Sequence, residues 1–156
     1  STELRSVKAL SILGKSGNGS VEMEGVEAGS IRHRLGNGSY RVSVASPEVD
    51  LVTTNGTVNV RVAEVHGRAK YCLRTTNGTI KVSLPSRVDL GTSLDLRTSV
   101  GRITAELGSL EIVRHERVGG GAFLAAHSPG CEACGDQLHL EANCVSGAIT
   151  VSAHTV

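Results

Sequence analysis

Apolar and polar residues alternate along most of the chain in short segments, and the segments are joined by Asn-Gly or a related dipeptide. The first residue of that dipeptide is, in turn, Asn18, Asn37, Asn55, Asn77, Val100 and Ser146. These positions are 19, 18, 22, 23 and 46 residues apart, and 46 is twice 23. Similarity at an interval of roughly 20 residues is typical of a repeat architecture.

Within each copy, apolar residues occupy every second position on both sides of the dipeptide. Around Asn77 these positions hold Tyr71, Leu73, Ile80 and Val82, with polar residues between them. Alternation with a period of two on both sides of a turn predicts two strands that share one buried face. Asn and Gly suit the turn because both tolerate positive φ.

Two all-β architectures satisfy this pattern. In an antiparallel hairpin meander or sandwich, Leu51 would face Val60 across the turn at Asn55. In a β-solenoid each copy is one coil, and the Asn-Gly corners lie above one another with strands about 4.8 Å apart. Six copies keep one register, and aromatic residues make up only 2% of the chain, which suits a narrow aliphatic interior. We therefore favour a right-handed, β-helix-like solenoid of about seven coils of 18–23 residues.

Residues 1–156 are expected to form a single domain. The rhythm weakens over 108–137, where a degenerate coil is predicted around the weak copy at 119–125. A loop insertion is expected within it at about 127–136, since Pro and Gly interrupt the pattern there. In a solenoid of this kind, Val58 and Ile80 should lie in one continuous column.

Composition narrows the classes of partner. The formal net charge is +1, so electrostatics do not point to nucleic acid. No apolar run is long enough to predict a membrane span, and no signal-peptide pattern is present in these residues.

The phrases TTNGTVNV, TTNGTIKV and SGAITV resemble the putative adhesin family, with its autotransporter adhesin heads and GIN-domain-like β-helix repeats. The resemblance covers about residues 10–107 and 138–153. It implies a stacked β-fold, a structural role and an extracellular or cell-surface location, and it carries no catalytic residues. The cysteine-containing segment departs from the family pattern.

That segment holds Cys131 and Cys134 in a CxxC spacing on a Gly-rich turn. With Cys144 and His127 it is a candidate for a zinc site, although no second CxxC is present, and we predict neither metal nor cofactor. A structural disulfide among Cys131, Cys134, Cys144 and Cys72 is favoured if the chain is exported. Cys144 is alternatively a small core residue.

Asn18, Asn37, Asn55 and Asn77 are each followed by Gly and then Ser or Thr, which makes them candidate N-glycosylation sites. We favour the interpretation that Asn-Gly is present because it forms the corner between two strands. For catalysis, the outward carboxylates Asp50 and Asp95 are the nearest to a pair, and sequence spacing places them two coils apart, roughly 9–10 Å. A solvated row of charges is the simpler interpretation, so no catalytic residues are predicted.

The sequence therefore predicts an adhesin-like surface or extracellular scaffold that is not an enzyme. No capping helix is evident at either end of the repeat, so association into homo-oligomers or filaments through ends or edges is expected. A carbohydrate-binding module that uses the flat polar faces for glycans is the alternative. A glycan-active β-helix enzyme using Asp50 or Asp95 is less favoured.

Overall fold

A computed structural model describes residues 2–62, 67–85, 90–106, 111–127 and 136–154. All secondary structure in these ranges is β-strand, which confirms the predicted class. The strands are β1 (Thr2–Arg5), β2 (Lys8–Asn18), β3 (Val21–Asn37), β4 (Tyr40–Val44), β5 (Glu48–Asn55), β6 (Val58–Val62), β7 (Arg68–Asn77), β8 (Ile80–Pro85), β9 (Leu90–Val100), β10 (Ile103–Glu106), β11 (Glu111–Val118), β12 (Gly121–His127), β13 (Asp136–Ser146) and β14 (Ile149–His154).

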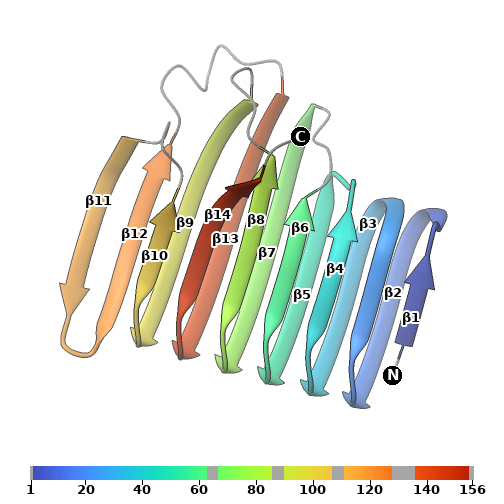
Figure 1. The fold of residues 1–156 in the computed structure, drawn as a ribbon, viewed down its shortest axis with the longest axis horizontal. Helices are drawn as coiled ribbons and strands as arrows, with labels where there is room; N and C mark the ends of the chain where they lie inside the picture. The colour runs from blue at the N-terminus through green and yellow to red at the C-terminus, as the bar shows by residue number, and fades with distance from the viewer. Residues whose placement is uncertain (1, 63–66, 86–89, 107–110, 128–135, 155–156) are drawn as a thin grey trace.

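The fourteen strands form one mostly parallel sheet that curls back on itself (Figure 1). We name its two halves by their strands. Arm A is, in spatial order, β1, the first part of β3, β4, β6, β8, β14 and β10. Arm B is β2, the second part of β3, β5, β7, β13, β9, β12 and β11.

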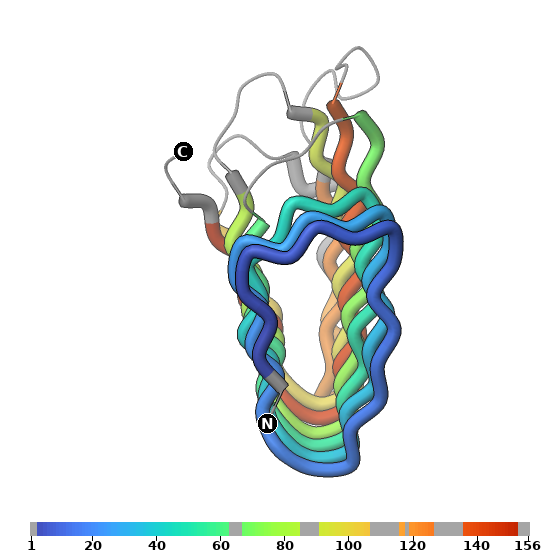
Figure 2. The backbone as a smooth tube through the Cα atoms, turned by 90° about the vertical axis from the view of Figure 1, so that its right-hand side faces the viewer, coloured from blue at the N-terminus to red at the C-terminus, as the bar shows by residue number. Residues whose placement is uncertain are grey.

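Seen along the stack, the backbone traces a flattened loop with the two arms facing each other (Figure 2). The alternating apolar residues point between the arms, where Leu51, Leu73, Ile80 and Val60 are fully buried. Most of this interior is aliphatic and closely packed, and the larger side chains of Met23, Tyr40 and Tyr71 are fully buried in it as well. The predicted inward and outward assignments are confirmed at these positions.

Stacking, and not hairpin formation, explains the Asn-Gly repeats. Val58 pairs with Ile80 in a parallel ladder, which confirms the predicted column. β5 and β6 flank Asn55 but do not pair with each other, because β5 lies between β3 and β7 and β6 lies between β4 and β8. The hairpin-meander alternative is therefore wrong for these motifs.

Each corner depends on a glycine that no other residue can replace without rearrangement. Gly38, Gly56 and Gly78 have φ between +139° and +148°. A Cβ atom on Gly56 would lie 1.6 Å from the carbonyl oxygen of Gly38 in the preceding coil. Glycine is thus needed for two reasons: it adopts the left-handed backbone conformation, and it allows the next coil to approach closely.

The asparagines at the corners bond to one another along the stack. The Nδ2 amide of Asn37 donates to Oδ1 of Asn18 at 2.8 Å, Asn55 donates to Asn37 at 2.6 Å, and Asn77 donates to Asn55 at 2.9 Å. Such ladders of identical amides form only where strands are parallel and in register. These hydrogen bonds explain why Asn occupies the corner position, as the favoured interpretation predicted.

The coils do not stack in sequence order, and here the structure corrects the prediction. We call the two strands around one corner a coil, and the last of them, β13 and β14, the inserted coil (residues 136–154). β13 pairs in parallel with both β7 and β9, and β14 pairs with both β8 and β10. The end of the chain therefore lies between two coils that are consecutive in sequence, as Figure 1 shows.

The degenerate coil predicted over 108–137 is also not what forms. Residues 111–127 fold into an antiparallel hairpin, β11–β12, and β12 pairs antiparallel with β9. Gly119, with φ of +60°, and Gly120 make the reversal, and Leu124 and Ala126 still alternate toward the core. The expected loop insertion at about 127–136 falls almost wholly outside the described residues.

Replacing a corner glycine should be far more damaging than replacing a glycine on an open surface. We expect Gly56→Ala to lower the free energy of unfolding by on the order of 3 kcal/mol or to prevent folding, because backbone must move to admit the Cβ. Gly17→Ala is the matched control, since a Cβ at Gly17 meets no atom within 4 Å. Chemical denaturation of both variants tests this, and equal midpoints would contradict it.

Candidate functional site

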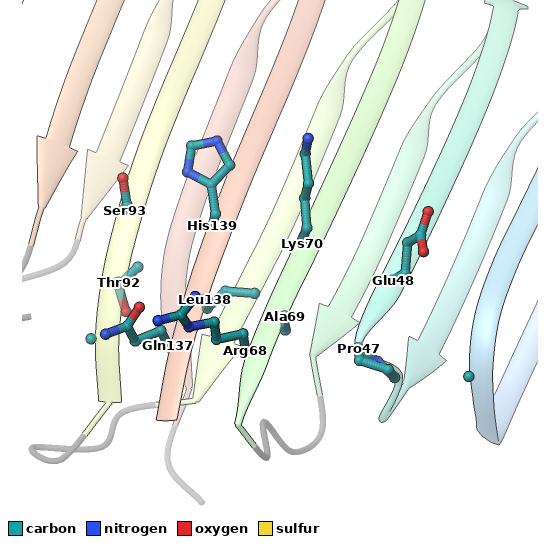
Figure 3. Close-up of a pocket in the computed structure, with 12 residues that line it drawn as sticks. Pro47, Glu48, Arg68, Ala69, Lys70, Thr92, Ser93, Gln137, Leu138 and His139 are labelled. Atoms are coloured by element: carbon teal, nitrogen blue, oxygen red, sulfur yellow. The ribbon is translucent and has the colours of Figure 1, made fainter. Parts of the chain in front are cut away.

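The outward side chains of arm B stand in rows that cross the strands, because the parallel register places equivalent residues side by side. One row consists of Glu48, Lys70, His139 and Ser93, contributed by β5, β7, β13 and β9 (Figure 3). It borders an open concavity of about 680 Å³. Gly91, at the start of β9, also lines the concavity and leaves room there by lacking a side chain.

This row has the composition of a hydrogen-bonding surface with one ion pair at its end. Arg32 Nη2 lies 3.6 Å from Glu48 Oε1, and both side chains are more than half exposed. An exposed pair of this kind stabilises little. Lys70 is exposed and His139 is half-buried, so both can reach a ligand that lies across the strands.

A second concavity, of about 730 Å³, lies nearer the corners on the same arm. Its outward residues include Arg74, Asn143, Arg97 and Phe123. The guanidinium carbon of Arg97 is 4.9 Å from the ring centre of Phe123, a cation–π contact across β9 and β12. Arg97 Nε is also 3.2 Å from Asp95 Oδ1, which holds the guanidinium in place.

The carboxylates are arranged differently from the sequence prediction. Asp50 and Asp95 share one row, but Cys72 and Glu141 both lie between them. Three strand spacings separate the two aspartates, about 14 Å, in place of the predicted 9–10 Å. The inserted coil causes the difference. It also places Glu141 beside Asp95, a neighbour that sequence order does not reveal.

The two described cysteines lie on opposite faces of the sheet. Cys144 is buried, and its thiol donates to the carbonyl of Gly78 at 3.4 Å, as expected of a small core residue. Cys72 stands in the outward row between Asp50 and Glu141. Both are free thiols. Burial raises the pKa of each, so a smaller fraction of each thiol is ionised at a given pH.

The remaining zinc and disulfide candidates are not placed together by the structure. Cys131 and Cys134 lie outside the described residues, and His127 ends β12 opposite Ser93. Among the described residues, no group of three His, Cys, Asp or Glu side chains is arranged to hold a metal ion. The zinc and disulfide readings that involve Cys131 and Cys134 stay predictions.

The four candidate glycosylation sites are exposed, and three of their amide nitrogens take part in the asparagine ladder. Asn18, at the end of the ladder, only accepts in it. Glycosylation at these positions stays a prediction, because the ladder explains why Asn is there but does not bear on modification.

One polar cluster inside the fold was not recognised from the sequence. His33 occupies an inward position, and its Nδ1 lies 2.8 Å from the hydroxyl of Tyr40 on the opposite arm. That hydroxyl donates to the carbonyl of Val52 at 3.2 Å, so Nδ1 carries the hydrogen of the first bond. Burial, with the charge of Asp50 adding to it, raises the pKa of Tyr40 well above its usual value.

A glycine in the neighbouring coil makes this cluster possible. A Cβ atom on Gly14 would lie 2.3 Å from Cδ2 of His33, so only glycine leaves room for the ring. The co-occurrence of Gly14 and His33 at equivalent repeat positions, where other copies hold Leu or Ala, was the available sequence signal.

Comparison with known proteins agrees with the fold. No family model and no curated protein sequence matches the chain. Among solved structures, the fold is similar to that of a protein from Clostridium sporogenes described as a "putative cell adhesion protein". The TM-score is 0.62 at 13% sequence identity, over 98% of this chain and 92% of that chain. At this identity the likeness establishes a shared fold.

The described residues contain no helix long and apolar enough to cross a membrane.

Stability should fall in mildly acidic solution through His33. Burial lowers the pKa of His33 below 6.5, so the unfolded chain takes up this proton at a higher pH than the folded chain. The stability associated with neutral His33 is present above about pH 6.5 and is lost as pH falls toward the folded pKa.

We expect His33→Gln to show a smaller loss of unfolding free energy than the unchanged protein between about pH 7.5 and about pH 5.5. His139→Gln is the control, because it removes an outward-facing histidine and leaves the His33–Tyr40 hydrogen bond in place. Denaturant titrations at several pH values measure the slopes. The same slope for His33→Gln and the unchanged protein would contradict the assignment.

Proposed function

We propose that the chain is an adhesin-like scaffold domain that acts at the cell surface or outside the cell and associates with copies of itself. The observation that carries this is a stack of mostly parallel, in-register strands whose N-terminal edge strands, β1 and β2, have no further partner among the described strands. We interpret the stack as a β-solenoid. Its similarity to the C. sporogenes structure over nearly the whole chain supports an adhesin-like role. No catalytic step is part of the proposal.

The N-terminal end of the stack is the better candidate for self-association. Among the strands that the structure describes, β1 and β2 each pair only with β3, so both arms end there in a strand with an open backbone edge. Leu10 and Leu13 on β2 are 94% and 74% exposed. Leu4, Val7 and Ile12 are only partly buried against the core. Open edges combined with apolar side chains favour contact with another chain.

The opposite end has a different form. There β10 ends arm A, while arm B continues for two further strands as the β11–β12 hairpin. Its edge strand β11 runs antiparallel to β12, and β12 runs antiparallel to β9, so arm B ends here in a hairpin, whereas at the N-terminal end both arms finish in strands of the parallel stack. This asymmetry favours the N-terminal end as the contact, whether it meets a second N-terminal end or the far end of another copy.

Charged residues on the N-terminal edge should abolish association without unfolding the domain. We expect the protein at micromolar concentration to form dimers or longer assemblies, and the double variant Leu10→Lys, Leu13→Lys to be monomeric, because like charges would meet at the contact. Val145→Lys is the matched control, since Val145 is 52% exposed on a strand in the middle of the stack.

Light scattering and negative-stain microscopy measure the outcome. A monodisperse monomer for the unchanged protein would end the self-association proposal. Assemblies that survive in the double variant would place the contact elsewhere.

Glycan binding is the second candidate, favoured by the concavity that Arg74, Asn143, Arg97 and Phe123 border on arm B. An aromatic ring next to amide and guanidinium donors can stack on a sugar and bond to its hydroxyls. We expect that, if the module binds glycans, Phe123→Ala and Arg97→Ala each weaken binding on a glycan array by about tenfold. Lys81→Ala, on arm A, is the control. Binding that is absent, or unchanged in both variants, would exclude this surface.

A further inference from the structure

The inserted coil occupies a slot between two coils that would otherwise be neighbours. In arm B its strand β13 separates β7 from β9, and in arm A its strand β14 separates β8 from β10. Both edges of the insert pair in parallel and in register over most of their length; Ala153 and His154 pair with β8 but not with β10. Along the chain, residues 86–89 connect β8 to β9 and so link the coils on the two sides of the slot.

The two walls of the slot present equivalent residues to the insert. Leu140 lies between Tyr71 and Leu94, and Ala142 lies between Leu73 and Leu96. In arm A, Ile149 likewise lies between Ile80 and Ile103. The two walls therefore present the same apolar pattern to the insert, in the same register.

The insert is also the last described part of the chain. Residues 128–135 connect it to β12. Once inside, it is buried as deeply as the rest of the core: Leu138, Leu140, Ile149 and Val151 are at most 1% exposed.

We propose that the inserted coil, Asp136–His154, is an exchangeable element, and that the slot between β7–β8 and β9–β10 accepts it from a second copy of the chain. The contacts in the exchanged form are the same as those within one chain, which is why exchange of an identical element is a low-cost route to association. Backbone ladders supply the affinity and the alternating side chains supply the register, as in other cases of strand addition.

This interaction goes beyond the proposed scaffold function and is separate from the N-terminal contact. Reciprocal exchange between two copies closes into a dimer, whereas one-way donation continues from chain to chain. A scaffold that used both could join copies through the slot and through the N-terminal edge.

Cysteine cross-linking between differently substituted chains tests the exchange. Thr150 on β14 and Lys81 on β8 are direct partners across the slot, and both point outward. Neighbours on adjacent strands lie about 4.8 Å apart, within the range of Cα separations that a disulfide can span. Full-length Lys81→Cys and full-length Thr150→Cys are unfolded together, refolded at high concentration and oxidised. Mass spectrometry then maps the linked peptides.

We expect a covalent dimer linked between positions 81 and 150. The matched control pairs Lys81→Cys with Asn59→Cys, because Asn59 is also a direct partner of Lys81 but lies in the chain's own preceding coil. Exchange of the inserted coil does not bring positions 59 and 81 of different chains together. A dimer linked between these two positions should therefore be absent from the control mixture. Mapping the peptides separates the engineered link from any that the native cysteines form.

A single chain that carries both Lys81→Cys and Thr150→Cys shows whether the geometry permits the bond. If this chain closes its own disulfide while the mixture yields no dimer linked at 81 and 150, the proposal is overturned. The mixture is also refolded with Leu10→Lys and Leu13→Lys in both chains. A link that persists there is exchange independent of the N-terminal edge, so either proposal can fail without the other.

Discussion

The whole structure depends on the close parallel approach of successive coils at their corners. Each corner must bring one backbone within hydrogen-bonding distance of the next, and the amide of Gly38 donates to the carbonyl of Asn55 at 2.8 Å. A side chain at the glycine would occupy the space of the neighbouring carbonyl. The same close contact is found at Gly38, Gly56, Gly78, Gly101 and Gly147, so the glycine of the repeated dipeptide reflects a steric constraint.

The buried side chains of the two arms form one core cluster between the arms. Leu, Ile, Val and Ala fill most of it, and threonines come inward near the corners. Thr98 Oγ1 donates to the carbonyl of Gly147 at 3.1 Å, so the threonine also binds a corner. The pair of His33 and Tyr40 joins the two arms through a hydrogen bond, and the absence of a side chain at Gly14 leaves room for it.

The apolar faces of the coils are equivalent, and this affects the order in which the coils stack. When each coil presents the same apolar pattern in the same register, the pattern does not specify which coil is its neighbour. The connections between strands then decide the order, and the last coil of the chain lies between the fourth and fifth copies of the repeat. The outward rows change with it, which is why Glu141 stands beside Asp95 and His139 stands between Lys70 and Ser93. The stacking order of the coils thus decides which residues are neighbours on the candidate surfaces of arm B.

The sequence by itself determined the strands, the buried face and the stacking at Asn-Gly, because alternation and corner chemistry are local and recur in every copy. It also placed Cys144 correctly among the alternatives as a small inward residue. Only the tertiary structure decided that residues 111–127 turn back as a hairpin and that the inserted coil separates β7 from β9. Those outcomes depend on which of several equally compatible edges a strand meets, and a periodic sequence carries little information about that choice.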